Sequence, residues 1–257
     1  MERCGYNDRY LLQMGVCRVK IHIVTCDDFA GWFPSPWHPY VSLFSRIEPG
    51  LEFALCSAVR GELPASPEPG ALYVIGGSRS SAYEKESWIL DLLEWIRLAH
   101  AQGAILAGIC FGHQALCEAL GGRVARAPEW WVGRRTARVT SEKLARVLTA
   151  CSGGHARSLT LHCHHHDQVV QLPPGAEVLA ASDFCPVEAF VLAESVIGFQ
   201  GHPEFSVETM RFLLREPLEG FSPEQRRKAI AGMDSGPQQG LLPHGKAVAE
   251  LILGLAR

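Results

Sequence analysis

The chain has 257 residues, long enough for one large α/β domain and short for two independent ones. Hydrophobic residues make up 47%, charged residues make up 20%, and the formal net charge is −3. This balance gives no electrostatic basis for binding nucleic acid or an anionic membrane, so a small molecule is the expected partner. No apolar stretch approaches the roughly 18 residues of a membrane span, and the N-terminus lacks a signal-peptide core. A cytoplasmic enzyme is therefore expected.

The first half of the chain alternates between predicted strands and helices. Strands are predicted at 19–25, 51–59, 71–75 and 104–107. The clearest helix is 86–102, where apolar residues recur at three-and-four spacing and Gly103 follows as a stop signal. This alternation predicts an α/β fold with a mostly parallel sheet covered on both faces. Residues 1–18 show no clear period and are interpreted as an N-terminal extension, and 19–257 as a single domain.

The second half of the chain has a different pattern of predicted elements. Short β-rich pieces are predicted at 123–126, 136–140, 158–163, 178–182, 188–192 and 196–200, and helices at 207–214, 223–231 and 246–255. This pattern indicates a smaller antiparallel β section, or one of mixed strands, followed by a C-terminal helical section. The aromatic and proline-rich segment 27–39 is predicted to be a loop near the strand ends, where ligands bind in parallel α/β sheets.

The heptapeptide GICFGHQ at 108–114 places Cys110 between a predicted strand and a predicted helix. Gly108 and Gly112 frame it, and a sharp strand-to-helix turn needs such residues because it leaves no room for Cβ atoms. A helix that begins after Cys110 directs backbone N–H groups and a positive dipole end at the sulfur, which favours the nucleophilic thiolate. The alternative is a cysteine that merely packs in a tight βα loop. Candidate catalytic partners elsewhere in the sequence are needed to distinguish the two interpretations.

The chain contains nine cysteines, an odd number with no CxxC pair. In a reducing compartment most of them are expected to be small buried hydrophobic side chains. Cys117, two helical turns after Cys110, is expected to face the core. Cys110 alone lies in a glycine-framed turn, which makes it the candidate reactive thiol.

A cysteine nucleophile needs a base, a group that orients the base, and donors for the oxyanion. His202 follows the predicted strand 196–200, and Glu204 lies two residues later, on the same side of an extended backbone. A carboxylate there would set the tautomer of the imidazole and stabilise its charged form. The N–H of Phe111 and the glycine loop 76–78 are the candidate oxyanion donors.

Together these motifs resemble the class I, or triad, glutamine amidotransferase family. The resemblance covers about residues 20–215 and rests on Gly108, Cys110, Gly112 and Gln114, then on the HPE motif at 202–204, with support from the strand that ends in Gly76 and Gly77 and from the HHDQV element at 165–169. It implies a flavodoxin-like three-layer α-β-α sandwich. It also implies a triad of Cys110, His202 and Glu204 that attacks a γ-glutamyl amide and forms a thioester, which water then hydrolyses.

The same resemblance implies roles for further residues. The N–H groups of Gly77 and Phe111 would hold the oxyanion, and Gln114 and Gly76 would contact the glutamyl group. The HxD element is typical of a loop that closes over the active site, so His165 and Asp167 are predicted to line the pocket.

The sequences of these motifs are most similar to those of the stand-alone γ-glutamyl peptidase branch of this family. Gly201 stands before His202 where the family often has a bulkier residue, and it is predicted to leave space on the acceptor side of the pocket. A hydrolase of γ-glutamyl amides is therefore the first hypothesis. The second is a glutaminase subunit that supplies ammonia to a separate synthetase partner, and the third is an inactive scaffold, against which the intact motifs weigh.

Four histidines within five residues, His162, His164, His165 and His166, raise the question of a metal site. Alternation along a strand would direct neighbouring side chains to opposite faces. No cysteine or carboxylate set was found to complete a tetrahedral shell. Neither a metal ion nor a cofactor is therefore expected.

Two residue pairs allow more than one reading. The family resemblance implies that Trp130 and Trp131 lie in a loop facing the nucleophile, where they would stack on the non-glutamyl part of a substrate or pack a small core. Arg134 and Arg135 would bind a substrate carboxylate or stay solvated.

Overall fold

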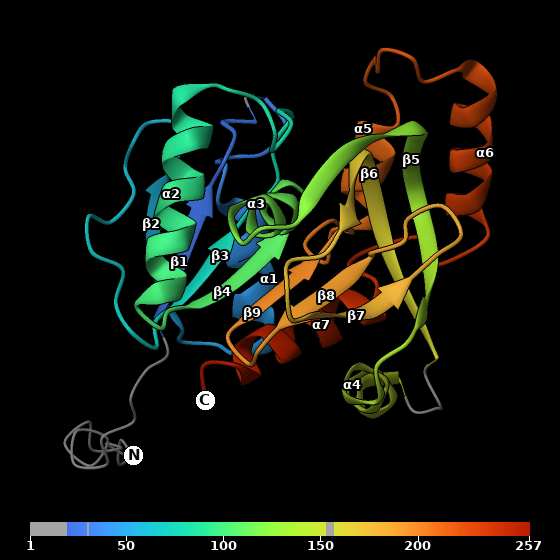
Figure 1. Cartoon of the computed structure of the whole chain (residues 1–257). Helices are drawn as coiled ribbons and strands as arrows, with labels where there is room; N and C mark the ends of the chain where they lie inside the picture. Colours follow the sequence, from blue (N-terminus) through green and yellow to red (C-terminus); the bar gives the residue numbers. More distant parts are fainter. Residues whose placement is uncertain (1–19, 30, 153–156) are drawn as a thin grey trace, which may run out of the picture.

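The computed structural model describes residues 20–29, 31–152 and 157–257 (Figure 1). The extension predicted for residues 1–18 lies outside the described residues, so it stays a prediction. Nine strands form one sheet in the order β2-β1-β3-β4-β9-β8-β7-β5-β6. Five of them run parallel: β2 (Glu52–Ser57), β1 (Lys20–Thr25), β3 (Leu72–Ile75), β4 (Ile105–Ile109) and β9 (Val196–Phe199). The mostly parallel sheet predicted for the first half of the chain is confirmed.

The remaining strands extend the sheet in antiparallel fashion: β8 (Ala189–Leu192), β7 (Ala176–Ala181), β5 (Arg123–Val139) and β6 (Ser158–Gln171). The two long strands β5 and β6 pair with each other and rise away from the parallel strands (Figure 1). An antiparallel section after the elbow is therefore confirmed as well.

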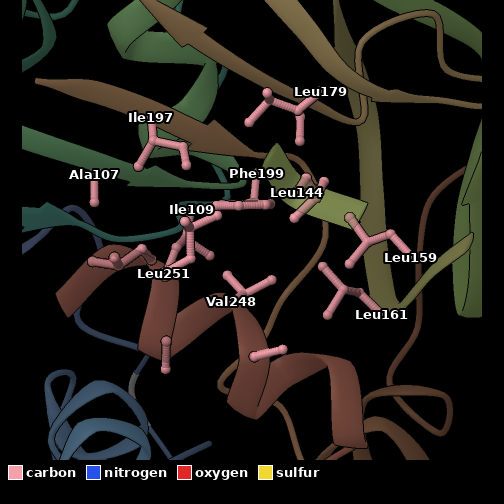
Figure 2. Close-up of a cluster of buried hydrophobic side chains, with 14 of the residues drawn as sticks. Ala107, Ile109, Leu144, Leu159, Leu161, Leu179, Ile197, Phe199, Val248 and Leu251 are labelled. Atoms are coloured by element: carbon pink, nitrogen blue, oxygen red, sulfur yellow. The ribbon is translucent and has the colours of Figure 1, made fainter. Parts of the chain in front are cut away.

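Seven helices are found in the described part of the chain: α1 (His38–Ile47), α2 (Ser87–Ala101), α3 (Phe111–Ala119), α4 (Glu142–Ser152), α5 (Val207–Leu213), α6 (Pro223–Asp234) and α7 (Pro243–Gly254). Helices α1 and α7 contribute to one buried cluster, and α2 and α3 contribute to another. Figure 2 shows the first cluster, in which Ile109 of β4 and Phe199 of β9 lie toward Val248 and Leu251 of α7. The parallel strands therefore form the middle layer of an α-β-α sandwich.

Side-chain alternation along the strands explains these two layers. Ile21 and Ile23 of β1 belong to the cluster of α1 and α7, whereas Val24 belongs to the cluster of α2 and α3. A strand that is buried on both faces needs apolar residues at successive positions, and the run Ile21 to Val24 is interrupted only by the buried His22. None of the helices in residues 20–257 that the structure describes is both long and apolar enough to cross a bilayer.

The second half of the chain differs from the prediction in three ways. The pieces 123–126 and 136–140 are one continuous strand, β5, with a register shift between Arg126 and Trp131. The HHDQV element is part of strand β6 and not a loop. Helix α4 was not predicted. Pro128 and Gly133 are residue types that favour turns, but the ladder to β6 resumes on both sides of the shift and keeps β5 extended.

The elbow around Cys110 requires glycine because two backbone segments nearly touch there. A Cβ atom on Gly112 would lie 2.1 Å from the carbonyl oxygen of Ile75, and one on Gly108 would lie 2.5 Å from the carbonyl carbon of Gly112. The N–H of Gly112 donates to the carbonyl oxygen of Gly76 at 3.0 Å, which ties the start of α3 to the end of β3. Both neighbouring groups are backbone, so they cannot rotate away from an added methyl group.

We expect Gly112→Ala to lower the free energy of unfolding by about 3 kcal/mol or more, because the added methyl group overlaps a backbone carbonyl. The matched control is Gly232→Ala in the interior of α6, where a Cβ would meet nothing within 4 Å. That control should raise stability by up to about 1 kcal/mol through helix propensity alone. Urea unfolding of the two variants measures both effects. Equal stability of Gly112→Ala and the parent chain would contradict the close packing at the elbow.

Candidate active site

Cys110 stands at the carboxyl end of β4 and at the N-cap of α3. Its backbone has a φ of 54° and a ψ of −106°, a conformation that side chains other than glycine rarely adopt. Such strain persists only where the surrounding structure enforces it, as the Gly108 and Gly112 contacts do here. The helix N-terminus next to the sulfur supplies N–H groups without partners in the helix and a positive dipole end. The strained elbow predicted around Cys110 is therefore present.

His202 and Glu204 lie beside this elbow, on the segment that follows β9. Nδ1 of His202 and Oε1 of Glu204 are 2.7 Å apart, and both side chains are buried. A carboxylate accepts only, so Nδ1 carries the proton in this contact and Nε2 remains for Cys110. The ring of Phe205 stacks on the ring of His202 with a centroid distance of 3.9 Å and an interplanar angle of 3°. The backbone N–H of His202 donates to the carbonyl oxygen of His162 at 2.7 Å.

These contacts hold the imidazole of His202 between the carboxylate of Glu204 and the thiol of Cys110. Burial lowers the pKa of His202, but the charges of Glu204 and Cys110 and their hydrogen bonds outweigh burial and raise it to about 10. At neutral pH the ring is therefore an imidazolium. A protonated imidazole beside a cysteine favours the thiolate form of the sulfur, and it also holds the proton that a leaving amine needs.

Cys110 and His202 open into a pocket of about 520 Å³, called here the Cys110 pocket. Of the residues predicted for the site, it is lined by Cys110, His202, Gln114, Gly77, His165 and Asp167. Glu204 lies behind His202, with a side chain that is fully buried. The pocket also contains Phe29 and Trp32, so the segment 27–39 does lie near the strand ends as predicted.

Gln114 is held by a buried amide network. Its Nε2 donates to the carbonyl oxygen of Asp167 at 2.9 Å and to Oε1 of Gln200 at 3.1 Å. The Gln200 amide in turn lies 3.8 Å from the sulfur of Cys110. The carboxylate of Asp167 accepts from the hydroxyl groups of Ser81 at 2.5 Å and Tyr83 at 3.1 Å. Asp167 thus joins β6 to the loop after β3, and Gln114 joins α3 to β6.

The two predicted oxyanion donors differ in their surroundings. The N–H of Phe111 is the first of α3, so it has no carbonyl partner within the helix. The N–H of Gly77 donates to the hydroxyl group of Tyr40 at 2.8 Å. Tyr40 is buried, and a Cβ atom on Gly76 would lie 2.5 Å from its hydroxyl oxygen. In this structure the Gly77 donor is therefore directed at Tyr40 and not at the pocket.

Two further glycines do not have the surroundings expected of them. Gly76 lies outside the set of described residues that line the pocket, and its N–H and C=O pair with Val24 and Gly112 instead. A Cβ atom on Gly201 would lie 2.8 Å from Cβ of Leu161. The small residue before His202 therefore allows β6 to pack closely and does not enlarge the acceptor side of the pocket. The interpretation of Gly201 was wrong because sequence does not show which strand faces it.

The structure also shows where the side chains of the tryptophan pair and the arginine pair lie. Trp130 lines the Cys110 pocket, whereas Trp131 stacks on Phe184 with a centroid distance of 4.2 Å. Both belong to strand β5 and not to a loop. Arg135 lies 4.0 Å above the ring of Trp131, and Arg134 donates to the hydroxyl group of Ser235. Neither arginine is among the described residues that line the pocket.

Several residues of the site were not identified from the sequence. Tyr40 was missed because it lies in no motif, and Gln200 was given no role although it lies two residues before His202. Only the fold brings them to Gly77 and Cys110. Arg79 forms an ion pair with Asp27 at 2.7 Å on the pocket wall. Burial alone would raise the pKa of Asp27, but hydrogen bonds from Arg79 lower it overall. Arg79 directly follows the glycine loop 76–78, and that position was the available signal.

The sequence of the chain is similar to a known protein family and to named relatives. Residues 68–217 match the family model for glutamine amidotransferase class-I. Gamma-glutamyl peptidase 3 from Arabidopsis thaliana is 31% identical over 75% of this chain and 79% of its own length.

Solved structures extend the likeness over almost the whole chain. A glutamine amidotransferase from Thermotoga maritima superposes with a TM-score of 0.68 at 18% identity, covering 93% of this chain and 98% of that one. A Thermoplasma acidophilum protein that provisionally carries the name of a GMP synthase subunit superposes with a TM-score of 0.57 at 18% identity, covering 92% of this chain and 94% of that one. The structural likeness supports the same three-layer fold. By its sequence match and its fold, the chain belongs to the class-I glutamine amidotransferase family.

Proposed function

We propose that the chain hydrolyses γ-glutamyl amide bonds through a thioester on Cys110. The observation that carries this proposal is the strained Cys110 elbow beside the buried pair of His202 and Glu204, which are 2.7 Å apart. A nucleophile, a base and an orienting carboxylate in this arrangement are the requirements for covalent acyl transfer. The γ-glutamyl specificity is carried over from the family and from the named relative of 31% identity.

The steps follow from the contacts. The thiolate of Cys110 attacks the γ-carbonyl carbon, and the oxyanion forms next to the N–H of Phe111. The C–N bond then breaks, and the imidazolium of His202 gives its proton to the leaving nitrogen. Water attacks the resulting thioester after losing a proton to His202, which releases glutamate and restores the thiolate. Glu204 accepts from Nδ1 of His202 and keeps that nitrogen protonated throughout.

The pocket supports a leaving group larger than ammonia. Its volume of about 520 Å³ lies within the range of sites for drug-sized ligands. Trp32 and Trp130 offer aromatic faces to it, and Arg126 offers a positive charge. A single glutamine would leave these groups unused, so γ-glutamyl peptides or conjugates with an acidic or aromatic leaving part fit better.

The second candidate is a glutaminase subunit that works with a synthetase partner. The contact between Gly77 and Tyr40 favours it, because a site with one oxyanion donor engaged elsewhere suits an enzyme that waits for a partner. The name of the Thermoplasma acidophilum neighbour points in the same direction.

Turnover by the isolated chain separates the two candidates. We expect steady release of glutamate from γ-glutamyl dipeptides without any other protein, with a higher kcat/KM than for free glutamine. The assay uses the purified chain, measures glutamate, and includes Cys110→Ala as the blank. Hydrolysis of glutamine alone, or none until a synthetase is added, would contradict the peptidase proposal and support the subunit.

Tyr40→Phe tests whether the Gly77 donor takes part in the reaction. The variant keeps the buried ring but removes the acceptor of the Gly77 N–H, so that N–H becomes free to bind an oxyanion. We expect kcat to stay at the parent value or to rise by a few fold, whereas losing a true oxyanion donor lowers kcat by about 10²-fold or more. A loss of that size in Tyr40→Phe would show that the phenol itself is required. Steady-state kinetics on one dipeptide substrate measures this.

A further inference from the structure

A second cluster of reactive side chains lies in the antiparallel part of the sheet. One ligand atom each from Cys163, His165 and Glu188 lies within 4.8 Å of the other two. All three residues are nine-tenths or more buried, with exposed fractions of 2%, 3% and 5%. Cys163 and His165 are two residues apart on β6, so they share one face of the strand, and Glu188 directly precedes β8. His165 therefore has a cysteine and a carboxylate as neighbours, and the carboxylate comes from a segment that the sequence did not connect with it.

The hydrogen bond of His165 determines which ring nitrogen is available. Nδ1 lies 3.0 Å from the carbonyl oxygen of Asp167. A carbonyl oxygen can only accept, so Nδ1 carries the proton and Nε2 carries the lone pair. That Nε2 is buried and has no hydrogen-bond partner among the described residues. A buried acceptor without a donor is rare in a folded protein. Because Nδ1 is engaged with Asp167, Nε2 is the nitrogen that His165 can offer to a ligand shared with Cys163 and Glu188.

The outer contacts are of the kind that orient metal ligands. Metal-binding histidines commonly donate their second ring N–H to a carbonyl or carboxylate, as His165 does. The Asp167 carbonyl is itself held by Nε2 of Gln114 at 2.9 Å. On the other side, Oε1 of Glu188 accepts from the hydroxyl group of Ser182 at 2.8 Å. Two of the three side chains are therefore held in place from outside the cluster.

We propose that Cys163, His165 and Glu188 form a zinc site. A thiolate, an imidazole nitrogen and a carboxylate oxygen are the ligand types that zinc takes, whereas magnesium and calcium prefer oxygen alone. Ligand atoms within 4.8 Å of one another need to move by only about 1 Å to reach the spacing that zinc–ligand bonds of roughly 2.0–2.3 Å require. Zinc has four positions, and the fourth is left for water or for the nearby buried thiol of Cys185.

Charge favours this occupant as well. A zinc ion would neutralise the two negative ligands, Cys163 and Glu188, which otherwise lie in a buried environment that disfavours charge. Arg135 is a nearby side chain that could neutralise these ligands in place of zinc, but its guanidinium group packs 4.0 Å above the ring of Trp131. The site would join β6 to the segment before β8, next to the wall of the Cys110 pocket that His165 forms. Its role is therefore structural, and it does not depend on the hydrolase activity proposed above.

The test measures zinc in the whole chain with Cys110 replaced by alanine, so that the catalytic thiol cannot hold the metal. We expect one zinc per chain by elemental analysis after dialysis. Cobalt added to the metal-free protein should show the visible absorption of tetrahedral coordination and a thiolate charge-transfer band. Added zinc should also raise Tm, because it binds only the folded state.

Substitutions then assign the ligands. In the same background, Cys163→Ser and His165→Ala should each reduce bound zinc to the background level. Cys163→Ser should also remove the cobalt–thiolate charge-transfer band, and His165→Ala should weaken the visible absorption of tetrahedral cobalt. Glu188→Gln is nearly isosteric, so it keeps the test valid if either of those variants fails to fold. The controls are His164→Ala, a neighbouring histidine on the opposite face of β6, and Cys26→Ser, a buried thiol elsewhere. Both should retain one zinc. No zinc in the Cys110→Ala parent, or full zinc in a folded Glu188→Gln variant, would overturn the proposal.

Discussion

Cys110→Ala is expected to reduce hydrolysis of γ-glutamyl substrates by a factor on the order of 10⁶, to the background of the assay. Without the sulfur there is no group in the pocket that can accept the glutamyl moiety, and the remaining donors only bind the substrate. The substitution keeps a Cβ atom at the strained φ of 54°, so the elbow itself should persist. Rates are measured by glutamate release, and folding by circular dichroism and urea unfolding.

The matched control is Cys56→Ala, which removes a half-buried thiol from β2 at the edge of the sheet. It should keep the parent rate. Acid quenching during turnover, followed by mass spectrometry, should find a γ-glutamyl adduct on the parent chain and none on Cys110→Ala. A folded Cys110→Ala protein that still hydrolysed these substrates would contradict the proposed function altogether.

Glu204→Gln is expected to lower kcat by about 10⁴-fold, because an amide can hold the imidazole in the wrong tautomer and cannot stabilise its charge. The charge of Glu204 is the main influence that raises the pKa of His202, so its removal should lower that pKa from about 10. The protonated ring is the acid for the leaving amine. The residual activity should therefore decline at a lower pH than in the parent, whose alkaline limb should lie near pH 10.

Two measurements check this prediction. The pH profile of kcat/KM reports the alkaline limb, and the chemical shift of the His202 ring carbon followed against pH reports the pKa directly. Glu194→Gln is the control, since Glu194 is exposed on the turn between β8 and β9 and far from the triad in the sheet. It should leave both quantities unchanged. An unchanged His202 pKa in Glu204→Gln would show that the carboxylate does not act on the ring.

The parallel half of the fold could be predicted from the sequence because its signals are local. Strands such as β3 are buried on both faces and therefore appear as short apolar runs, and α2 carries its apolar stripe at helical spacing. The elbow was predictable for the same reason. Gly108 and Gly112 are required by contacts within a few residues of Cys110 or with the adjacent strand.

The antiparallel half was harder because its strands depend on partners that are distant in the chain. Strand β5 passes through Pro128 and Gly133, which favour turns, and it stays extended because β6 pairs with it before and after the register shift. The HHDQV element was assigned to a loop, although its pairing with 123–131 makes it a strand. Local propensity is a weak guide where tertiary hydrogen bonds decide the conformation.

The sequence alone determined the family resemblance, the alternation of strands and helices in the first half of the chain, and the candidate trio of Cys110, His202 and Glu204, because these depend on short motifs and on periodicity. It did not show that β9 joins the parallel strands. Only the tertiary structure decided what faces each of these groups. It directed the Gly77 N–H to Tyr40 and filled the space beside Gly201 with Leu161. It also brought Glu188 to Cys163 and His165. The physical reason is that such contacts join segments tens of residues apart, and their distances follow from sheet register and packing, which no local pattern encodes.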